Sequence, residues 1–250
     1  MKGRKSMVNK KWIPLAAGIG ILVLIVAVIY GCTNMYNNTQ SEERYVRGVD
    51  LSAYQGEIDW QTLAEQNIDF AYIKATEGHD YVDSQFKTNW EKSQDTDIKV
   101  GAYHFLNYDT TGKSQAENFI ANVPVSKDNL PPVLDLELYG QYEENALPKE
   151  QVKVILDEFL KTIEEHYGVK PIIYTSQRVF NMYIGTDYKD YKVWIVDLDN
   201  SWPEKLPNGT EFTFWQYTQR GILDGYNGNE TFIDMDLYKG TYDEFLKEFF

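Results

Sequence analysis

The stretch Pro132-Val133-Leu134-Asp135-Leu136-Glu137-Leu138 alternates leucine with carboxylate. Successive side chains of a β-strand point to opposite faces, so the leucines share one face and Asp135 and Glu137 share the other. In a parallel α/β barrel the leucine face packs against outer helices and the acidic face points into the barrel interior. The stretch therefore predicts a barrel strand with two carboxylates near its C-terminal end, where barrel enzymes hold their catalytic groups.

Short apolar runs and amphipathic helical runs alternate along the rest of the chain. The predicted strands are Gly48–Leu51, Phe70–Ala75, Val100–Phe105, Pro132–Leu138, Pro171–Thr175, Val193–Val196, Phe212–Tyr217 and Thr231–Leu237. The clearest predicted helix is Lys149–Tyr167, whose apolar residues recur at helical spacing before Gly168 and Pro171 end it. Weaker helical patterns cover Asp59–Gln66, Ser84–Lys92 and Ser114–Asn122.

This order of elements predicts an α/β fold with a closed sheet. Strands that alternate with helices form parallel sheets, and eight strands within residues 47–250 favour a barrel over an open sheet. The last three predicted strands have no convincing helix between them. We therefore expect an irregular (β/α)5β3 TIM-like barrel, preceded by one N-terminal transmembrane helix.

Further acidic residues, Asp50, Glu77 and Asp234, stand in or directly after other predicted strands. Carboxylates two residues apart on one strand are about 7 Å apart, and in a low-dielectric interior both cannot ionise without cost. One of them should therefore have a raised pKa and act as a general acid near neutral pH, as cleavage of a glycosidic bond requires. A structural ion-pair network is the alternative, but Lys74 is the one obvious cation nearby.

The sequence lacks the motifs of several other enzyme classes. Its three histidines have no H-E-x-x-H spacing, and neither G-x-S-x-G nor G-x-x-x-x-G-K occurs. The single cysteine, Cys32, excludes an intrachain disulfide and lies far from any predicted cleft. We therefore expect no metal site, no cofactor and no cysteine nucleophile.

Aromatic residues make up 15% of the chain, and several stand near predicted strand ends. Aromatic faces pack well against the apolar faces of sugars, while hydroxyl and amide groups fix the orientation of a ligand. Core packing is the alternative role for each of them. The substrate-binding candidates are Tyr54, Tyr103, Tyr174, Trp194 and Gln216.

Taken together, these motifs resemble those of family 25 glycoside hydrolases, in the same order along the chain. They are Gly48-Val49-Asp50-Leu51-Ser52-Ala53-Tyr54-Gln55-Gly56, Ile73-Lys74-Ala75-Thr76-Glu77-Gly78, Gly101-Ala102-Tyr103-His104-Phe105, Asp135-Leu136-Glu137, Ile173-Tyr174-Thr175 and Trp215-Gln216-Tyr217. The family comprises lysozymes, or N-acetylmuramidases, which cleave the β-1,4 bond between N-acetylmuramic acid and N-acetylglucosamine. The resemblance extends from Arg47 to the C-terminus and implies the same irregular barrel of five β/α units and three final strands.

The resemblance also implies roles for four carboxylates as the catalytic residues. Glu137 matches the general acid that protonates the leaving oxygen. Asp135 matches the residue that orients and polarises the 2-acetamido group of the substrate, or otherwise assists attack at the anomeric carbon. Asp50 and Asp234 match two further cleft aspartates that position the substrate and tune Glu137. The separation of the pair by itself predicts inversion at the anomeric carbon, whereas acetamido participation predicts retention, so the stereochemical outcome stays open.

The sequence departs from the family pattern in two places. Members usually have Val-Asp-Leu-Asn where this chain has Ile233-Asp234-Met235-Asp236, so Asp236 adds a charge on the face of Asp234. Asp197 follows Trp194-Ile195-Val196, where members commonly have alanine. Two other functions stay open, a non-catalytic cell-wall glycan-binding module on the same barrel and a chitinase-like glycosidase. For the latter, Tyr238 occupies the position of the expected acid.

The N-terminal region predicts a membrane anchor. Basic residues precede an uncharged stretch from Trp12 to Tyr30, long enough to span a bilayer core. Basic flanks stay in the cytoplasm. We therefore expect a cytoplasmic segment at 1–11, a single-pass transmembrane signal-anchor at 12–30, a polar linker at 31–46 and an extracellular glycoside hydrolase barrel at 47–250 that faces the cell wall. A cleaved signal peptide, a lipoprotein anchor on Cys32 and a buried core helix are the alternatives.

The charge of the chain bears on its partners. Of the 24 Lys/Arg and 38 Asp/Glu residues, 18 and 36 respectively lie from Arg47 onward. Such an acidic surface argues against nucleic acid as a partner. The expected partners are peptidoglycan glycan strands, the membrane through the N-terminal helix, and other proteins of the membrane.

Overall fold

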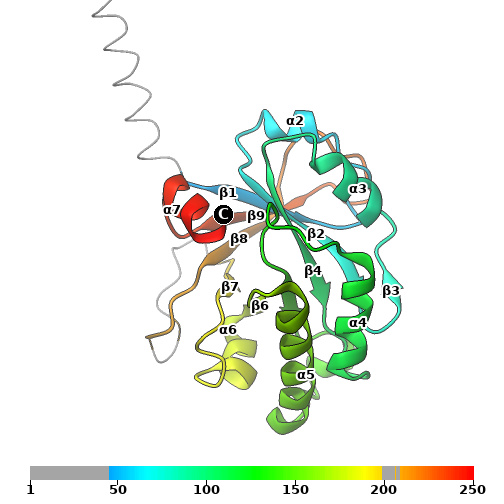
Figure 1. Cartoon of the computed structure of the whole chain (residues 1–250), viewed down its shortest axis with the longest axis vertical. Helices are drawn as coiled ribbons and strands as arrows, with labels where there is room; N and C mark the ends of the chain where they lie inside the picture. Colours follow the sequence, from blue (N-terminus) through cyan, green and yellow to red (C-terminus); the bar gives the residue numbers. More distant parts are fainter. Residues whose placement is uncertain (1–44, 199–205, 207–208) are drawn as a thin grey trace, which may run out of the picture. The chain divides into compact units, whose positions relative to one another are not determined.

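The computed structural model describes residues 45–198, 206 and 209–250, and within them eight strands close into a barrel (Figure 1). The barrel strands are β1 (Arg47–Leu51), β2 (Phe70–Glu77), β4 (Lys99–Phe105), β5 (Val133–Leu136), β6 (Ile172–Ser176), β7 (Val193–Val196), β8 (Phe214–Gly221) and β9 (Ile233–Tyr238). The barrel closes because β1 pairs with β2 on one side and with β9 on the other. Barrel strands β1 to β8 run parallel, whereas β9 is antiparallel to β8 and β1.

Helical segments follow the first five barrel strands. They are α2 (Trp60–Ala64), α3 (Phe86–Ser93), α4 (Gly112–Asn122), the 3₁₀ helix η1 (Gly140–Tyr142) with α5 (Lys149–Tyr167), and α6 (Gln177–Val179) with the π-helix η2 (Phe180–Ile184). Between β7 and β9, the described residues contain no α-helix. This order agrees with the predicted irregular (β/α)5β3 barrel. A two-residue strand, β3 (Tyr81–Val82), was not predicted and pairs with the end of β2 outside the barrel.

The predicted segments at 1–11 and 12–30, and the linker at 31–46 as far as residue 44, lie outside the described residues. In the part of the chain that the structure describes, no helix has both the length and the apolar character needed to cross a membrane. Residues Tyr45–Phe250 form one compact unit, and the site described below belongs to it.

Two apolar layers lie on the two sides of the barrel wall. Leu134 and Leu136 are fully buried in the layer between the wall and the helices, as the alternation in their strand predicted. Val133 points the other way, into the barrel interior. Bulky aromatic side chains fill that interior, among them Phe70, Tyr72, Trp194 and Phe214. Aromatic packing thus closes the middle of the barrel beneath the carboxylates.

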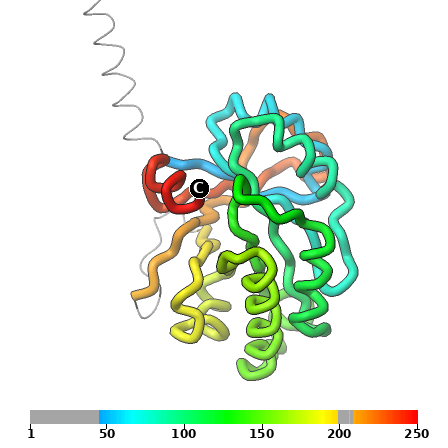
Figure 2. Tube along the Cα trace, in the orientation of Figure 1, coloured from blue at the N-terminus to red at the C-terminus, as the bar shows by residue number. Residues whose placement is uncertain are grey.

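Helix α7 (Tyr242–Phe249), which was not predicted, lies beside the start of β1 (Figures 1 and 2). It begins at Thr241, whose side chain forms a capping box with Glu244. Phe245 is fully buried and its ring centroid lies 5.7 Å from that of Phe70 and 5.3 Å from that of Tyr238. The helix therefore closes the end of the barrel at which β1 begins.

Strand β5 is shorter than the predicted strand Pro132–Leu138. The backbone carbonyls at its C-terminal end bind side chains instead of a neighbouring strand. Thr175 Oγ1 donates to the carbonyl of Leu136 at 2.9 Å, and the hydroxyl of Tyr108 donates to the carbonyl of Glu137 at 2.8 Å. The chain thus leaves the sheet after Leu136, and Glu137 stands just beyond the strand.

Candidate active site

The four predicted catalytic carboxylates line one cavity of about 230 Å³. Asp50 comes from β1, Asp135 and Glu137 come from β5 and its end, and Asp234 comes from β9. The parallel strands present their C-terminal ends at this edge of the barrel. Strand β9 is antiparallel, so Asp234 reaches the same edge from near the beginning of its strand. The topology therefore brings together four acids that are distant in sequence.

Asp135 and Glu137 differ in their surroundings although they share a strand face. Asp135 is buried, and its Oδ1 has no hydrogen-bond partner among residues 45–198, 206 and 209–250. Burial raises the pKa of Asp135 well above its usual value, and the charges of Glu137 and Asp50 raise it further, while Lys74 lowers it. Burial also raises the pKa of Glu137, against the lowering effects of the Tyr174 hydroxyl and Lys74. The expected raised pKa in this pair is confirmed.

Asp50 and Asp234 lie directly opposite each other on β1 and β9. The side-chain amide of Gln216 joins them, with Nε2 donating to Asp50 Oδ2 at 2.8 Å and to Asp234 Oδ2 at 3.1 Å. Burial and the neighbouring carboxylates together raise the pKa of both carboxyls, that of Asp234 to about 7. The hydroxyl of Tyr174 donates to Gln216 Oε1 at 2.9 Å, which fixes the direction of the amide.

Lys74 is the one lysine or arginine among the described residues that line the cavity. Its Nζ lies 2.7 Å from Glu77 Oε2 and 4.9 Å from the centre of the Phe105 ring. Because Glu77 partly neutralises the positive charge of Lys74, the carboxyl groups that line the cavity outnumber the positive charge available to them. Glu77 itself lies outside the cavity and lines an adjoining pocket, together with Tyr54, Asp109 and other residues.

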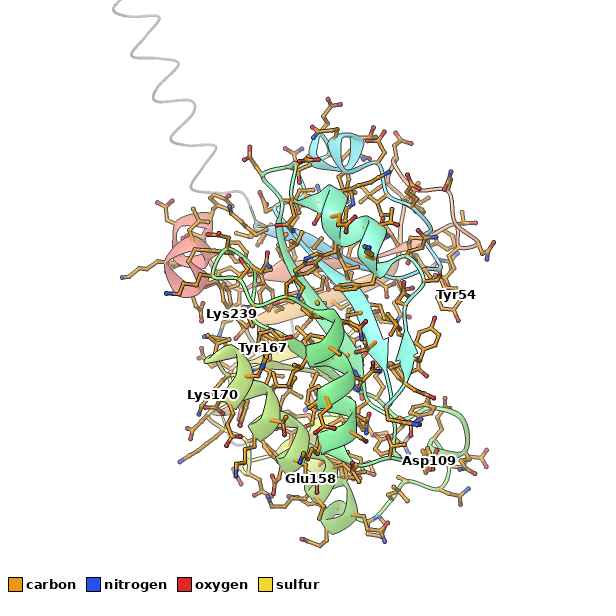
Figure 3. All side chains as sticks on the ribbon, turned by 45° about the vertical axis from the view of Figure 1, so that its right-hand side comes forward. Tyr54, Asp109, Glu158, Tyr167, Lys170 and Lys239 are labelled. Carbon is orange, nitrogen blue, oxygen red and sulfur yellow. The ribbon has the colours of Figure 1, made fainter. Side chains whose placement is uncertain are left out.

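The five substrate-binding candidates fall into two groups. Tyr103 and Tyr174 line the cavity, and Tyr54 stands at its mouth with 60% of its surface exposed. Figure 3 labels Tyr54 and Asp109 on the side of the barrel opposite to Lys170 and Lys239. Trp194 borders the cavity but is only 1% exposed, so it presents almost no surface for stacking on a sugar.

Gln216 is likewise buried and reaches the site through its hydrogen bonds. Trp194 and Gln216 therefore lie behind the cavity surface and support the residues that line it. The substrate-binding roles of all five candidates remain predictions.

Other cavity residues were not predicted from the sequence. Gln55 Nε2 donates to Glu230 Oε2 at 3.1 Å, and Gln55 Oε1 accepts from the Ser52 backbone N–H at 2.9 Å. This joins the loop after β1 to the loop before β9 across a sequence separation of 175 residues. Gln219, on β8, also lines the cavity. Gln55 and Glu230 lie on loops, where no periodic pattern marks functional residues. Only the sequence motif around Gln55 pointed to this part of the site.

The chemistry that this cavity supports is proton transfer. Several of its acids have raised pKa values, that of Asp234 at about 7, and so keep a proton to higher pH than exposed carboxyls do, which suits a general acid. Hydroxyl and amide donors, supplied by Tyr174 and Gln216, hold the acids in fixed directions. No group of three His, Cys, Asp or Glu side chains in the described residues is arranged to hold a metal ion.

Comparison with known proteins adds independent findings. The family model described as glycosyl hydrolases family 25 matches residues 49–226. A solved structure of a family 25 glycosyl hydrolase from Bacillus anthracis is 43% identical with a TM-score of 0.76, covering 82% of this chain and 94% of that chain. Lysozyme M1 of Streptomyces globisporus is 31% identical over 78% of this chain and 68% of its own length. An uncharacterized protein of Escherichia coli (strain K12), YegX, is 32% identical over 80% of this chain and 71% of its own length.

Proposed function

The chain belongs to glycosyl hydrolase family 25, and from this membership and its carboxylate cavity we infer that it is a peptidoglycan muramidase. It cleaves the β-1,4 bond between N-acetylmuramic acid and N-acetylglucosamine. The observation that carries this function is Glu137, a carboxyl with a raised pKa that lines the cavity beside three further acids. Relatives named as lysozymes support the same substrate class.

Glu137 acts as the general acid. In its protonated form it gives its proton to the glycosidic oxygen as the bond to the anomeric carbon breaks, so that the leaving sugar departs as a neutral alcohol. Burial keeps this proton on the carboxyl at a higher pH than in an exposed glutamate. The nearby Tyr174 hydroxyl, whose one hydrogen points to Gln216 Oε1 in this structure, can turn to donate to the carboxylate that remains.

Asp135 assists the substrate's own acetamido group. Its carboxylate accepts a hydrogen bond from the acetamido N–H, which directs the acetamido oxygen to form a bond with the anomeric carbon as the leaving group departs. Water then opens this cyclic intermediate and returns a proton to Glu137, giving retention. Asp50 and Asp234, joined by Gln216, hold the floor of the cavity in place.

Loss of turbidity in a cell-wall suspension tests the catalytic role of Glu137. The Glu137→Gln variant keeps the shape of the side chain but has no proton to donate, so its rate should fall by about 10²- to 10⁴-fold. Glu143→Gln is the matched control, because Glu143 is exposed and stands outside the cavity. It should keep the wild-type rate.

Two alternative functions predict other results. A non-catalytic glycan-binding module would give the same negligible rate for the wild type and for Glu137→Gln while both proteins sediment with cell walls. A chitinase-like glycosidase would release new reducing ends from chitin and none from peptidoglycan. Either result would overturn the muramidase function.

We further propose that the enzyme is held in the cell membrane by residues 12–30, with residues 1–11 in the cytoplasm and the barrel outside, facing the cell wall. The support is the uncharged length of this segment and the basic residues before it. An anchor of this kind suits local opening of the cell's own wall together with other membrane proteins. Alkaline washing of membranes should leave the full chain in the pellet and release a variant without residues 12–30. Release of both would contradict the anchor.

A further inference from the structure

Asp236 is a buried acid beside the catalytic cavity to which the proposed mechanism gives no role. It lies two residues after Asp234 on β9, so both side chains point to the same face of the strand. Asp234 lines the cavity, whereas Asp236 is fully buried one layer deeper in the barrel. Its register partners are Gly48 on β1 and Gln216 on β8.

The two carboxyl oxygens of Asp236 have different partners. Oδ1 accepts a hydrogen bond from Trp194 Nε1 at 3.1 Å. Oδ2 is buried and receives no hydrogen bond from any donor in the described part of the chain. Asp50 stands on β1 opposite Asp234, two residues along from the register partner of Asp236, and its carboxyl interacts with that of Asp236. Two carboxylates are both acceptors, so they form a hydrogen bond only when one of them carries a proton.

The surroundings of Asp236 disfavour a negative charge on it. The groups that face it are Asp50 from β1, Tyr72 from β2, Trp194 from β7 and Asp234 on its own strand. None of these described groups is a cation. Burial raises the pKa of Asp236 well above its usual value, and the charges of Asp50 and Asp234 raise it further. The indole N–H of Trp194 acts in the opposite direction.

Of the two interacting carboxyls, Asp50 can hold a negative charge more easily than Asp236 can. It lines the cavity and is only half-buried, and its Oδ2 already accepts a hydrogen bond from Gln216. Burial raises the pKa of both acids, but the contact between them lowers that of Asp50 and raises that of Asp236. A proton shared between them therefore resides on Asp236.

We propose that Asp236 is a positioning residue that remains protonated at neutral pH and donates a hydrogen bond from Oδ2 to the carboxylate of Asp50. This inference rests on the proposed function of the cavity. Asp50 is then held by two donors, the amide of Gln216 and the carboxylic acid of Asp236, and Asp236 is held in turn by Trp194. Trp194 thus acts on the site through Asp236.

Carbon-13 NMR of the aspartate carboxyls tests the protonation directly and needs no enzyme activity. The spectrum of the full-length wild type should contain a protonated aspartate carboxyl at about pH 7 that is absent from Asp236→Asn. In Asp50→Asn this carboxyl should titrate at lower pH, because the neighbouring negative charge is gone. A carboxyl assigned to Asp236 that is ionised at this pH would overturn the proposal. If Asp236→Asn does not fold, sequence-specific assignment of the Asp236 carboxyl carbon in the wild type decides the same question.

Kinetics test the positioning role. Asp236→Ala removes the donor, and kcat should fall by about tenfold or more, as expected for the loss of a hydrogen bond to a charged group. Asp236→Asn supplies an amide N–H in the same place and should recover most of that loss. The exposed Asp190→Asn is the matched control. If folded Asp236→Asn is as impaired as Asp236→Ala, the positioning role is wrong. If the wild type itself does not cleave peptidoglycan, the muramidase function fails and the NMR result still decides the protonation.

Discussion

At the scale of single residues, Asp135 and Glu137 show how one strand face can hold two acids with different tasks. Asp135 is the more buried and has an oxygen without a hydrogen-bond partner in the described residues, whereas Glu137 stands beyond the strand with its backbone carbonyl held by Tyr108. An unpartnered buried oxygen suits an acceptor that awaits a substrate N–H. The more accessible carboxyl suits the proton donor.

Replacing Lys74 by methionine should shift the pH dependence of activity. Lys74 lowers the pKa of Glu137 and of Asp135. Without it the pKa of Glu137 rises, its proton-donating form persists to higher pH, and the alkaline limb of kcat/KM should move upward. Lys87→Met is the matched control, because the side chain of Lys87 is 86% exposed and forms an ion pair with Glu91, far from the cavity residues in sequence. An alkaline limb that moves downward in Lys74→Met would show that Lys74 does not act on the general acid.

Sequence reasoning found those site residues that a local pattern marks. The alternation of leucine and carboxylate located Asp135 and Glu137, and positions near strand ends located Asp50 and Asp234. The bond between Gln55 and Glu230 depends on loops that only barrel closure brings together, so no local pattern predicts it. The burial of Trp194 could not be foreseen either. Whether an aromatic residue on an inward face reaches the cavity depends on the depth to which neighbouring rings fill the barrel.

At the scale of elements, periodicity governed what could be predicted. Helix α5 has the predicted bounds Lys149–Tyr167, because its apolar stripe is long and Gly168 takes the left-handed conformation that ends it. The short segments α6, η2 and β3 have too few residues for a period to emerge. Helix α7 has clear local signals, a capping box and a buried Phe245, but it lies after the last barrel strand, where the fold itself requires no helix.

Truncation of Phe245 tests the role of α7 as the element that closes one end of the barrel. Phe245 is fully buried against Phe70, Phe214 and Tyr238. Phe245→Ala should lower the free energy of unfolding by about 3–5 kcal/mol, as is typical of a large aromatic residue lost from a core. Lys247→Ala on the exposed side of the same helix should change it by less than about 0.5 kcal/mol. Urea denaturation measures both, and equal small effects would mean that α7 is not part of the core.

At the scale of the whole molecule, the buried acids make stability depend on pH. As the pH rises, Asp50, Asp135, Asp234 and Asp236 keep their protons to higher pH in the folded state than in the unfolded chain, because their pKa values are raised, that of Asp234 to about 7. The unfolded chain releases these protons near pH 4. The stabilisation is therefore complete below that pH and is lost as the pH rises through the folded-state pKa values. Buried His104, with its pKa lowered to about 4, opposes this trend between its folded and unfolded pKa values.

Four acids outweigh one histidine, so the urea midpoint of unfolding should be higher at about pH 5.5 than at about pH 8. Asp236→Asn should flatten this dependence, because the amide does not titrate. A midpoint that increases between these two pH values would contradict the assignment of protons to the buried acids.

The acidity of the molecule gives a reason for the proposed membrane anchor. The chain carries a net charge of −14, and anionic wall polymers do not attract such a surface. A membrane tether would supply the local concentration that electrostatic attraction does not provide. The catalytic cavity lies at the edge of the barrel opposite to the beginning of β1, where the chain enters the barrel.

Mass spectrometry of the fragments released from purified peptidoglycan tests the central claim most directly. The wild type should release fragments with muramic acid at every new reducing end, because the proposed general acid, Glu137, would protonate the oxygen that leaves the anomeric carbon of that sugar. The Glu137→Gln variant should release almost none of them. Fragments with N-acetylglucosamine at the new reducing end, or the same yield of muramic acid ends from both proteins, would contradict the account.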